Sequence, residues 1–233
     1  MYKSLVIGFA GRARSGKDTC VRHLIDTYQS VYTIKRFAFA DDLKQELYDA
    51  LSNQYNPYWD VAPFNFLLLP HTPEAYGGLV TSDIPLGDKI AWVNEHRTEL
   101  RPVLQHYGTE YRRAQSPFYW VKCLSDRISA EDPQIALVSD VRFKSEFFYI
   151  KSVGGYVTRI TRYGYTDPNC DPNHVSETEL DKVPFDFEIN VLDGEVDQLR
   201  KDAVTVFELV KQLVDPITEE DVYAAGADEE TTL

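Results

Sequence analysis

A glycine-rich segment near the N-terminus constrains the fold of this chain more than any other feature. Residues Gly11 to Lys17 follow the pattern G-x-x-x-x-G-K, after the apolar run Ser4–Ala10 and before a helical pattern. Between a strand and a helix, this pattern predicts a phosphate-binding loop, because glycines let consecutive backbone N–H groups turn toward a phosphate and the helix N-terminus adds partial positive charge. The alternative is a glycine-rich turn beside a solvated lysine, which the full spacing and both flanks disfavour.

The residues of this segment indicate the ligand. We expect ATP here, and the residues expected to bind it are Gly11, Arg14, Ser15, Gly16, Lys17, Asp18 and Thr19. We expect the loop to be exposed, with Lys17 bridging the β- and γ-phosphates and neutralising charge as a phosphoryl group moves. Asp18 stands where the pattern has Ser or Thr. The Lys-x-Thr order resembles phosphate loops of nucleoside monophosphate kinases, so either Thr19 or, through water, Asp18 approaches a bound Mg²⁺.

Strand and helix patterns alternate along the rest of the chain. Strand-like runs are Thr33–Phe39, Ile135–Ser139, Tyr156–Thr161 and Phe187–Val191. One helical pattern follows a cap at Asp41 or Asp42, and another covers Lys89–Gly108, where Pro102 obscures a break between two helices. A third begins at Ser116-Pro117. A fourth follows the run Ile135–Ser139 and ends at Gly154 or Gly155, and the last begins at Val196. Because such alternation produces right-handed βαβ units, the sequence predicts an α/β fold with a parallel sheet of about five strands and helices on both faces.

The chain length and composition suit one domain. We expect residues 1–215 to form it, with an irregular insertion at about 53–87 and a small lid region at about 162–185. The remaining residues, 216–233, are polar and acidic, and we expect them to be disordered.

Charge and cysteine content restrict the partners. The net charge of −13 argues against a nucleic-acid backbone as the main partner, although seven of the acids lie after Lys211. No apolar run approaches the roughly 20 residues of a membrane span, and no signal peptide is evident, so we expect a cytoplasmic protein without a membrane partner. The three cysteines are far apart and unclustered, as expected of reduced thiols.

Three further segments are candidates for a second substrate site. Arg101 and Gln105 are four residues apart in R-P-V-L-Q-H-Y-G-T-E, so they share one helix face. D-V-R-F-K-S-E, residues 140–146, lies just beyond an expected strand, where parallel sheets bind ligands. Arg159, Arg162 and residues 174–181 fall where a mobile lid is expected.

Six motifs together resemble the deoxynucleoside monophosphate kinases of tailed bacteriophages. They are G-x4-G-K-D-T, F-A-F-A-D-D-L-K, L-Q-x-x-G-T-E, a Trp-Val pair, D-V-R-F-x-x-E and H-V-S-E-T-E-L, in the same order over residues 5 to about 192. The resemblance implies a P-loop kinase fold, MgATP, a deoxynucleoside monophosphate acceptor for DNA precursor synthesis, and a location in the host cytoplasm. It leaves homodimerisation open.

The resemblance also implies residue roles. It places around the acceptor monophosphate Arg101, Gln105, Thr109, Trp120, Asp140, Arg142 and Glu146. It does not fix Lys44, Arg112 or Arg113, which stay in second rank. We expect catalysis to depend on Lys17, Asp18, Arg142 and Arg101. We expect the bulk of Trp120 to disfavour a 2′-hydroxyl and Glu146 to accept a hydrogen bond from the 3′-hydroxyl.

Each of these residues also has a purely structural interpretation. Trp120 fits a helix core, Asp140 and Arg142 fit a surface ion pair, and Arg101 and Glu146 fit solvated helix charges. Ser176 and Glu179 match a capping box, and we treat the histidines as structural.

The chemistry expected of such a site needs cations more than a base. A phosphate monoester is mostly a dianion at neutral pH, so it needs no general base to act as a nucleophile. We expect Arg101 and Arg142 on the acceptor, Lys17 with Mg²⁺ on ATP, and Arg159 or Arg162 reaching in when the lid closes. The alternatives are another small-molecule P-loop kinase, such as a dephospho-coenzyme A kinase, a nucleotide-binding switch or ATPase module, and a catalytically inactive relative.

Overall fold

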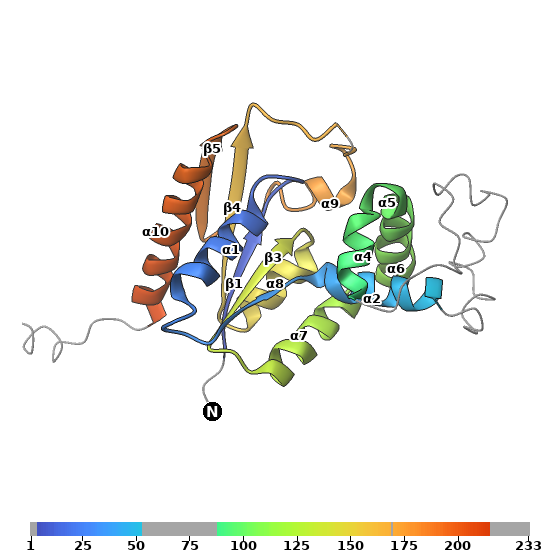
Figure 1. Cartoon of the computed structure of the whole chain (residues 1–233), viewed down its shortest axis with the longest axis horizontal. Coiled ribbons are helices and arrows are strands. Elements are labelled where there is room, and N and C mark those ends of the chain that lie inside the picture. Colours follow the sequence, from blue (N-terminus) through green and yellow to red (C-terminus); the bar gives the residue numbers. More distant parts are fainter. Residues whose placement is uncertain (1–3, 53–87, 169, 215–233) are drawn as a thin grey trace, which may run out of the picture.

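The computed structural model describes residues 4–52, 88–168 and 170–214. A parallel sheet runs through this part of the chain, with the strand order β2-β3-β1-β4-β5 (Figure 1). Its strands are β1 (Leu5–Ala10), β2 (Ile34–Phe37), β3 (Ile135–Val141), β4 (Tyr156–Tyr163) and β5 (Phe187–Leu192). Every pairing is parallel, so the predicted α/β class with a parallel sheet of about five strands is confirmed.

The position of β1 in the sheet determines where a ligand can bind. In the register, Leu5 of β1 faces Ile135 of β3, and Ile7 of β1 faces Tyr156 of β4. The carboxyl ends of β1 and β3 therefore lie side by side. In open parallel sheets, ligands bind outside these ends, where successive connections leave in opposite directions. The glycine-rich segment follows β1, and Arg142 follows β3 directly.

Helices cover both faces of the sheet, as predicted. The helices α1 (Lys17–Tyr28) and α10 (Val196–Val214) pack together on one face, with Leu24 and Phe207 in their shared core. The other face is covered by α7 (Tyr119–Glu131) and α8 (Lys144–Ser152), with Leu124 and Ile150 in a second core (Figure 1). Burial on both faces explains the nearly continuous apolar sequence of β1 and β3.

A helical group stands beside the sheet. It consists of α2 (Phe39–Ser52), α4 (Lys89–Glu95), α5 (Arg97–Gln105), the π-helix η4 (His106–Arg112) and the single turn α6 (Arg113–Gln115). A small apolar cluster that includes Leu47, Trp92 and Leu100 joins α2 to α4 and α5. The last short helix, α9 (Val175–Thr178), lies in the connection between β4 and β5, which we call the lid segment (residues 164–186).

Several expected boundaries were wrong. α2 begins at Phe39, before Asp41 and Asp42, because the Asp140 carboxylate accepts hydrogen bonds from the Phe39 and Ala40 N–H groups at 2.8 and 2.9 Å. The same carboxylate lies inside β3, which continues two residues past Ser139.

Two further helix starts are fixed by the structure: the sequence leaves one of them open, and the other differs from the expectation. The break inside Lys89–Gly108 falls at His96, and α5 continues through Pro102. α7 begins at Tyr119, because Ser116 and Pro117 form a preceding turn in which the Ser116 carbonyl accepts the Tyr119 N–H at 3.0 Å.

The expected insertion at 53–87 and the acidic tail at 216–233 lie outside the described residues. The three cysteines are free thiols. Among the described helices, none has the length and apolar character needed to span a bilayer.

Candidate active site

The glycine-rich loop between β1 and α1, residues 11–17, has the backbone conformation of a phosphate cradle. Gly11 and Gly16 have φ angles of 142° and 105°. A Cβ atom at Gly11 would lie 2.4 Å from the Ile160 carbonyl oxygen, and one at Gly16 would lie 2.5 Å from Leu199 Cδ2. Only glycine fits either position, because of both the left-handed backbone and the close neighbours. We call this segment the phosphate loop.

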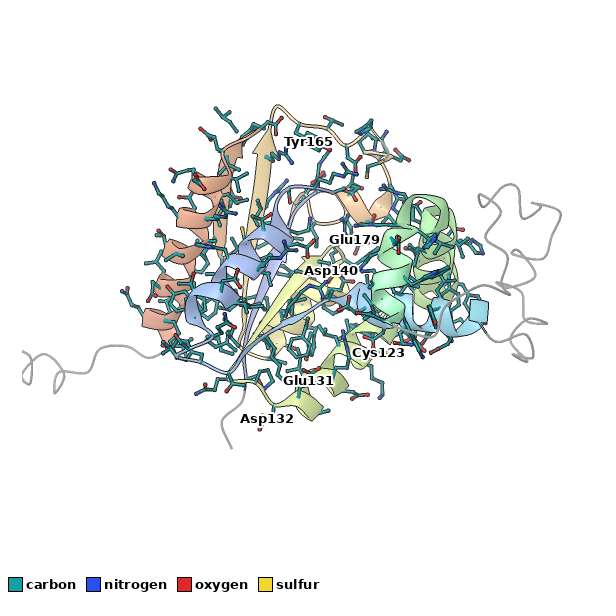
Figure 2. All side chains as sticks on the ribbon, in the orientation of Figure 1. Cys123, Glu131, Asp132, Asp140, Tyr165 and Glu179 are labelled. Atoms are coloured by element: carbon teal, nitrogen blue, oxygen red, sulfur yellow. The ribbon has the colours of Figure 1, made fainter. Side chains whose placement is uncertain are left out.

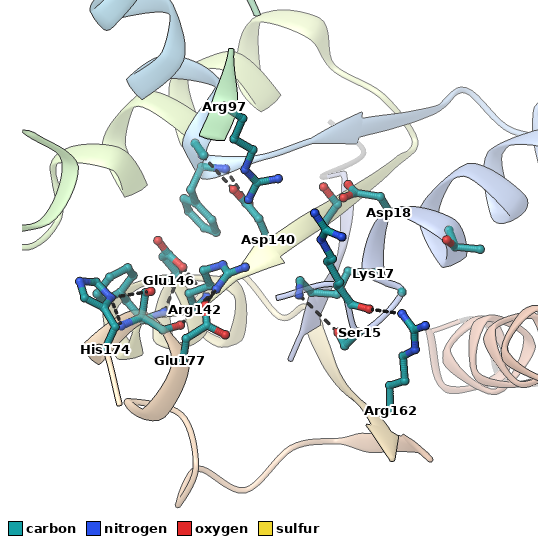
Figure 3. Close-up of a pocket in the computed structure, with 18 of the residues that line it drawn as sticks. Ser15, Lys17, Asp18, Arg97, Asp140, Arg142, Glu146, Arg162, His174 and Glu177 are labelled. Carbon is teal, nitrogen blue, oxygen red and sulfur yellow. Dashed lines mark hydrogen bonds and ion pairs between the residues drawn. The ribbon is translucent and has the colours of Figure 1, made fainter. Parts of the chain in front are cut away.

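Lys17 lies under this loop with its ammonium group inward. Its Nζ donates to the carbonyl oxygens of Gly11 and Arg12, both at 2.7 Å, and the residue is 5% exposed. Figure 3 shows the same group beside Ser15, whose hydroxyl lies 3.3 Å away.

The expectation of an exposed loop is therefore wrong for Lys17, although Arg12 and Arg14 are exposed. Burial, with the nearby Arg142 charge, lowers the pKa of Lys17 to about 7. A cation that is desolvated to this degree gains strongly from an anion placed beside it.

A single pocket of about 480 Å³ extends from the phosphate loop to the helical group. The structure brings together on its wall all but one of the predicted site residues: Arg14, Ser15, Gly16, Lys17, Asp18, Thr19, Arg101, Gln105, Thr109, Trp120, Asp140, Arg142 and Glu146. Gly11 is the exception and lines a smaller cavity behind the loop. The sequence segments that supply these residues are up to about half the chain apart, so the fold alone places them together.

Arginines form one wall of the pocket. Arg97 and Arg101 lie four residues apart on α5, and both line the pocket. Arg142, just after β3, lines it as well, and Figure 3 shows it together with Arg97. Arg97 is solvent-exposed at the pocket wall, and partial desolvation together with the charges of Arg142 and Arg101 lowers its pKa. Like charges held together are unfavourable unless an anion binds among them. Sequence reasoning missed Arg97, although its i, i+4, i+8 spacing with Arg101 and Gln105 could have identified it.

Two buried polar side-chain atoms of pocket-lining residues have no hydrogen-bond partner in the described part of the chain. They are the Ser139 hydroxyl and the Arg113 Nη1. Such atoms in a folded protein bond a ligand or water in most cases. Arg113 and Lys44, both held in second rank, line the pocket. Arg112 does not line it, and pairs with Glu46 at 3.0 Å.

The Glu146 carboxylate is already engaged by the protein. One oxygen pairs with Arg113, and the other accepts the N–H groups of Arg142 at 2.7 Å and Phe143 at 3.1 Å. Burial raises the pKa of Glu146 to about 6, against the opposing effect of Arg113. Its principal contacts therefore fix the start of α8 and the backbone of Arg142. Its predicted bond to a 3′-hydroxyl stays a prediction.

Asp140 and Trp120 have mainly structural contacts. Asp140, at the carboxyl end of β3 near the middle of the molecule (Figure 2), uses both oxygens to hold the N-terminus of α2. Trp120 is 1% exposed, and its Nε1 donates to the Gly108 carbonyl oxygen at 3.0 Å. Trp120 belongs to the apolar core and also lines the pocket, so a structural role and a role in contacting a ligand are compatible.

Apolar side chains line the pocket beyond the arginines. They are Phe39 and Leu43 of α2, Leu104 of α5, and Phe143. Phe39 also belongs to the apolar core that contains Trp120, and Leu43 packs against that core. Sequence reasoning quoted the motifs that contain Phe39, Leu43 and Phe143 but assigned these residues no role. The opposite end of the pocket is lined by the turn between β5 and α10, residues 191–196. That turn had no recognisable motif, so the sequence offered no signal for it.

Of the two arginines expected near the lid, Arg162 lines the pocket and Arg159 does not, and a movement of either toward a phosphoryl group stays a prediction. Arg162 pairs with Asp193, and its Nη1 donates to the Arg14 carbonyl oxygen at 2.9 Å. Arg159 contacts Asp181 at 3.4 Å. Arg162 thus joins the phosphate loop to the turn after β5, and Arg159 joins β4 to the lid segment.

The lid helix is capped differently from the expectation. His174 precedes α9, and its Nδ1 accepts the Ser176 N–H at 3.2 Å. The capping-box interpretation of Ser176 and Glu179 was therefore wrong. The Glu179 carboxylate accepts the Lys144 N–H at 2.8 Å, which links the lid to α8.

Asp18 and Thr19, directly after the phosphate loop, are the residues that the sequence suggests for Mg²⁺. Both line the pocket, and the Asp18 side chain is 68% exposed with Arg36 at 3.8 Å. The described residues contain no cluster of three His, Cys, Asp or Glu side chains. An exposed carboxylate and a hydroxyl fit Mg²⁺, which usually takes one or two protein oxygens and completes its shell with phosphates and water.

Comparison of the sequence with models of known protein families, and with curated proteins, finds no match. The assignment of a function therefore depends on the motifs and on the geometry of this pocket.

Proposed function

We propose that this protein transfers the γ-phosphoryl group of ATP to a deoxynucleoside 5′-monophosphate. The observation that carries the proposal is one continuous pocket with a phosphate loop at one end and clustered arginines at the other. A nucleotide-binding switch needs only the first of these features. The clustered arginines provide a site for a second anion, which can lie in line with the phosphates bound by the loop, as transfer between two phosphates requires.

The side chains suggest a division of the pocket. The phosphate loop and Lys17 bind the β- and γ-phosphates, and the turn at residues 191–196 contacts the base of ATP. Mg²⁺, held with ATP by Asp18 and Thr19, neutralises part of the phosphate charge. Arg142 and Arg101 bind the acceptor phosphate, and the apolar side chains of Phe39 and Leu43 contact its base.

The reaction then depends on charge and alignment. The acceptor dianion needs no base, so the arginines overcome its repulsion from ATP and hold it in line. Lys17 stabilises the charge that moves from the γ-phosphoryl group to the β-phosphate. The lid segment excludes water, which would otherwise compete as the acceptor.

The test is ADP release from MgATP with each deoxynucleotide, each ribonucleotide and dephospho-coenzyme A as acceptor. We expect at least one deoxynucleoside monophosphate to stimulate release strongly. Stimulation by dephospho-coenzyme A alone would support the closest rival. Slow release that no acceptor changes would support an ATPase module and contradict the proposal.

The preference for deoxyribose comes from the resemblance and is tested separately. We expect kcat/KM to be roughly tens to hundreds of times higher for dGMP than for GMP, and for dTMP than for UMP. This is the range of discrimination by an apolar contact against an added hydroxyl group. Equal use of both sugars would remove the deoxy part and leave the kinase part intact.

A further inference from the structure

Three acidic side chains of the lid segment reach the phosphate loop. Asp181 pairs with Arg12 at 3.5 Å and Asp167 pairs with Arg14 at 3.4 Å, and both arginines are exposed. The third acid, Glu177, is buried and contacts the loop backbone.

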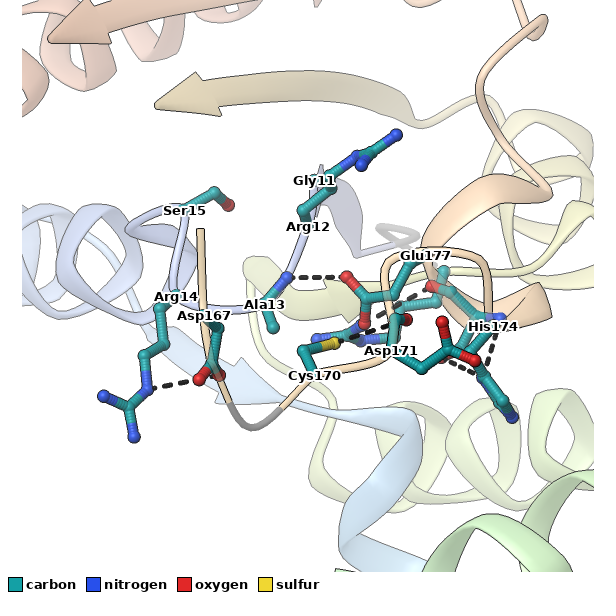
Figure 4. Close-up of polar contacts among 12 residues, drawn as sticks. Gly11, Arg12, Ala13, Arg14, Ser15, Asp167, Cys170, Asp171, His174 and Glu177 are labelled. Carbon is teal, nitrogen blue, oxygen red and sulfur yellow. Dashed lines mark hydrogen bonds and ion pairs between the residues drawn. The ribbon is translucent and has the colours of Figure 1, made fainter. Parts of the chain in front are cut away.

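Glu177 lies on α9, and its Oε2 accepts a hydrogen bond from the Ala13 N–H at 2.8 Å (Figure 4). The Glu177 side chain is 3% exposed. The two residues are 164 positions apart, so this contact joins the lid segment to the phosphate loop through the fold and not through local chain geometry.

The other carboxylate oxygen of Glu177 binds the acceptor end of the pocket. Its Oε1 forms an ion pair with Nη1 of Arg142, and the same Nη1 lies 3.4 Å from the Ser176 carbonyl oxygen (Figure 3). A single carboxylate thus bridges the phosphate loop and the arginine proposed to bind the acceptor.

This carboxylate is charged in spite of its burial. Burial alone would raise the pKa of Glu177, but the Arg142 guanidinium and the Ala13 N–H hold it below its usual range. A buried charge is tolerated only when it is paired and hydrogen-bonded, and removing one partner of such a pair is costly. The Glu177 carboxylate therefore depends on both Arg142 and the Ala13 N–H, and loss of either partner would be unfavourable.

The pairing also leaves Arg142 able to bind a phosphate. A guanidinium has five N–H donors, and the contacts of Arg142 with Glu177 and Ser176 all use Nη1. The Nη2 and Nε donors form the edge that pairs bidentately with a phosphate. Glu177 can thus hold one side of the guanidinium and leave the other for the acceptor.

We propose that Glu177 is a positioning residue that couples lid docking to the alignment of the two substrates. It contacts neither substrate, and it acts by aiming Arg142 and by fixing the phosphate loop at Ala13. This inference rests on the proposed kinase function, because it assumes that Arg142 binds the acceptor phosphate.

The test is a double-mutant cycle of Glu177→Gln and Arg142→Lys, with Glu179→Gln as the matched control. Glu179 is an acid on the same lid segment, but its carboxylate bonds the Lys144 N–H and does not line the pocket. The readouts are the acceptor KM, kcat, and the Kd of MgATP measured by calorimetry.

We expect Glu177→Gln to raise the acceptor KM and lower kcat by a combined factor of roughly 10 to 100, the scale of a small misalignment, with the MgATP Kd within about threefold of wild type. In the Arg142→Lys background, the same change should have less than about a twofold further effect, because the residue it positions is already altered. Glu179→Gln should leave all three quantities unchanged.

Independent effects of the two substitutions, with multiplying losses, would overturn the proposal. A much tighter MgATP Kd in Glu177→Gln would also overturn it, because the carboxylate would then compete with phosphate for the loop.

Failure of the kinase function itself would be recognised in wild type, as ADP release that no acceptor stimulates. In that case, hydrogen exchange without substrates still tests the bridge. Residues 12–14 and 174–180 should exchange several times faster in Glu177→Gln than in Glu179→Gln. Equal exchange in the two variants would show that Glu177 does not hold the lid to the loop.

Discussion

Lys17 shows how one side chain can be prepared for an anion. Its ammonium group lies among carbonyl oxygens of its own loop, out of water, and its pKa is lowered by that burial. Ionised groups are stabilised in such a place by an opposite charge, and phosphates of ATP would supply it.

The first prediction concerns this residue. Lys17→Ala should reduce phosphoryl transfer at least ~100-fold, the scale for one preorganised electrostatic contact, while the protein remains folded. Turnover and circular dichroism measure the two parts. Lys35→Ala is the control, because Lys35 pairs with Glu131 away from the pocket. Near-normal turnover in Lys17→Ala would exclude a role for the loop in catalysis.

The second prediction concerns Trp120. Because the ring is buried in the core, Trp120→Ala should lower the free energy of unfolding by about 3–5 kcal/mol, as large-to-small core substitutions do. Trp120→Phe, which keeps most of the bulk, is therefore the better probe of sugar preference. Urea denaturation and the kcat/KM ratio of dGMP over GMP measure these effects. If both variants leave that ratio unchanged, the indole has no role in sugar discrimination.

At the scale of elements, the π-helix η4 sets the width of the pocket. Gly108 in η4 is buried, and a Cβ atom there would lie 2.7 Å from Cδ2 of Leu43 in α2. Both residues line the pocket, and the Gly108 carbonyl also receives the indole N–H of Trp120. The close contact of η4 with α2 therefore depends on the absence of a side chain.

The third prediction uses this contact. Gly108→Ala should push Leu43 into the pocket, raise the acceptor KM several-fold and destabilise the protein by about 1–3 kcal/mol, the usual cost of overpacking. Adding Leu43→Ala should recover much of the KM, because it removes the displaced side chain. The KM of ATP should change little. An unaltered acceptor KM in Gly108→Ala would place the acceptor elsewhere.

At the scale of the whole molecule, the parallel sheet brings separate segments to one edge. The phosphate loop follows β1, Arg142 follows β3, and the lid segment follows β4. Glu146 lies just after β3, where its buried carboxylate binds Arg113 and the backbone of Arg142.

The fourth prediction follows from the raised pKa of Glu146. The folded protein holds this proton up to about pH 6, whereas the unfolded chain releases it near 4.5. Unfolding therefore releases a proton between these values, and the contribution of Glu146 to stability falls as pH rises, by about 2 kcal/mol in total. Denaturant unfolding at pH 5 and pH 7 should show wild type losing stability relative to Glu146→Gln. The exposed Glu188→Gln should show no such pH-dependent difference, and equal curves for Glu146→Gln and wild type would contradict the prediction.

The sequence alone determined the class of fold and the position of the loop. Apolar runs such as Leu5–Ala10 are readable because strands buried on both faces exclude polar residues. The glycines of the loop are readable because their backbone conformation and close neighbours admit no side chain. Arg101 and Gln105 were placed on one helix face by their spacing alone.

The tertiary structure decided which partner each side chain meets. The contact between Glu177 and Ala13 and the cap of α2 by Asp140 join segments that are 164 and about 100 residues apart. Local periodicity carries no information on such pairings, because it reports only which face of an element is apolar. The start of α2 at Phe39 is the clearest case, since the carboxylate that fixes it belongs to Asp140 in β3, about 100 residues away. The phosphate loop could thus be recognised in the sequence, whereas the carboxylate that ties it to Arg142 could be found only in the folded chain.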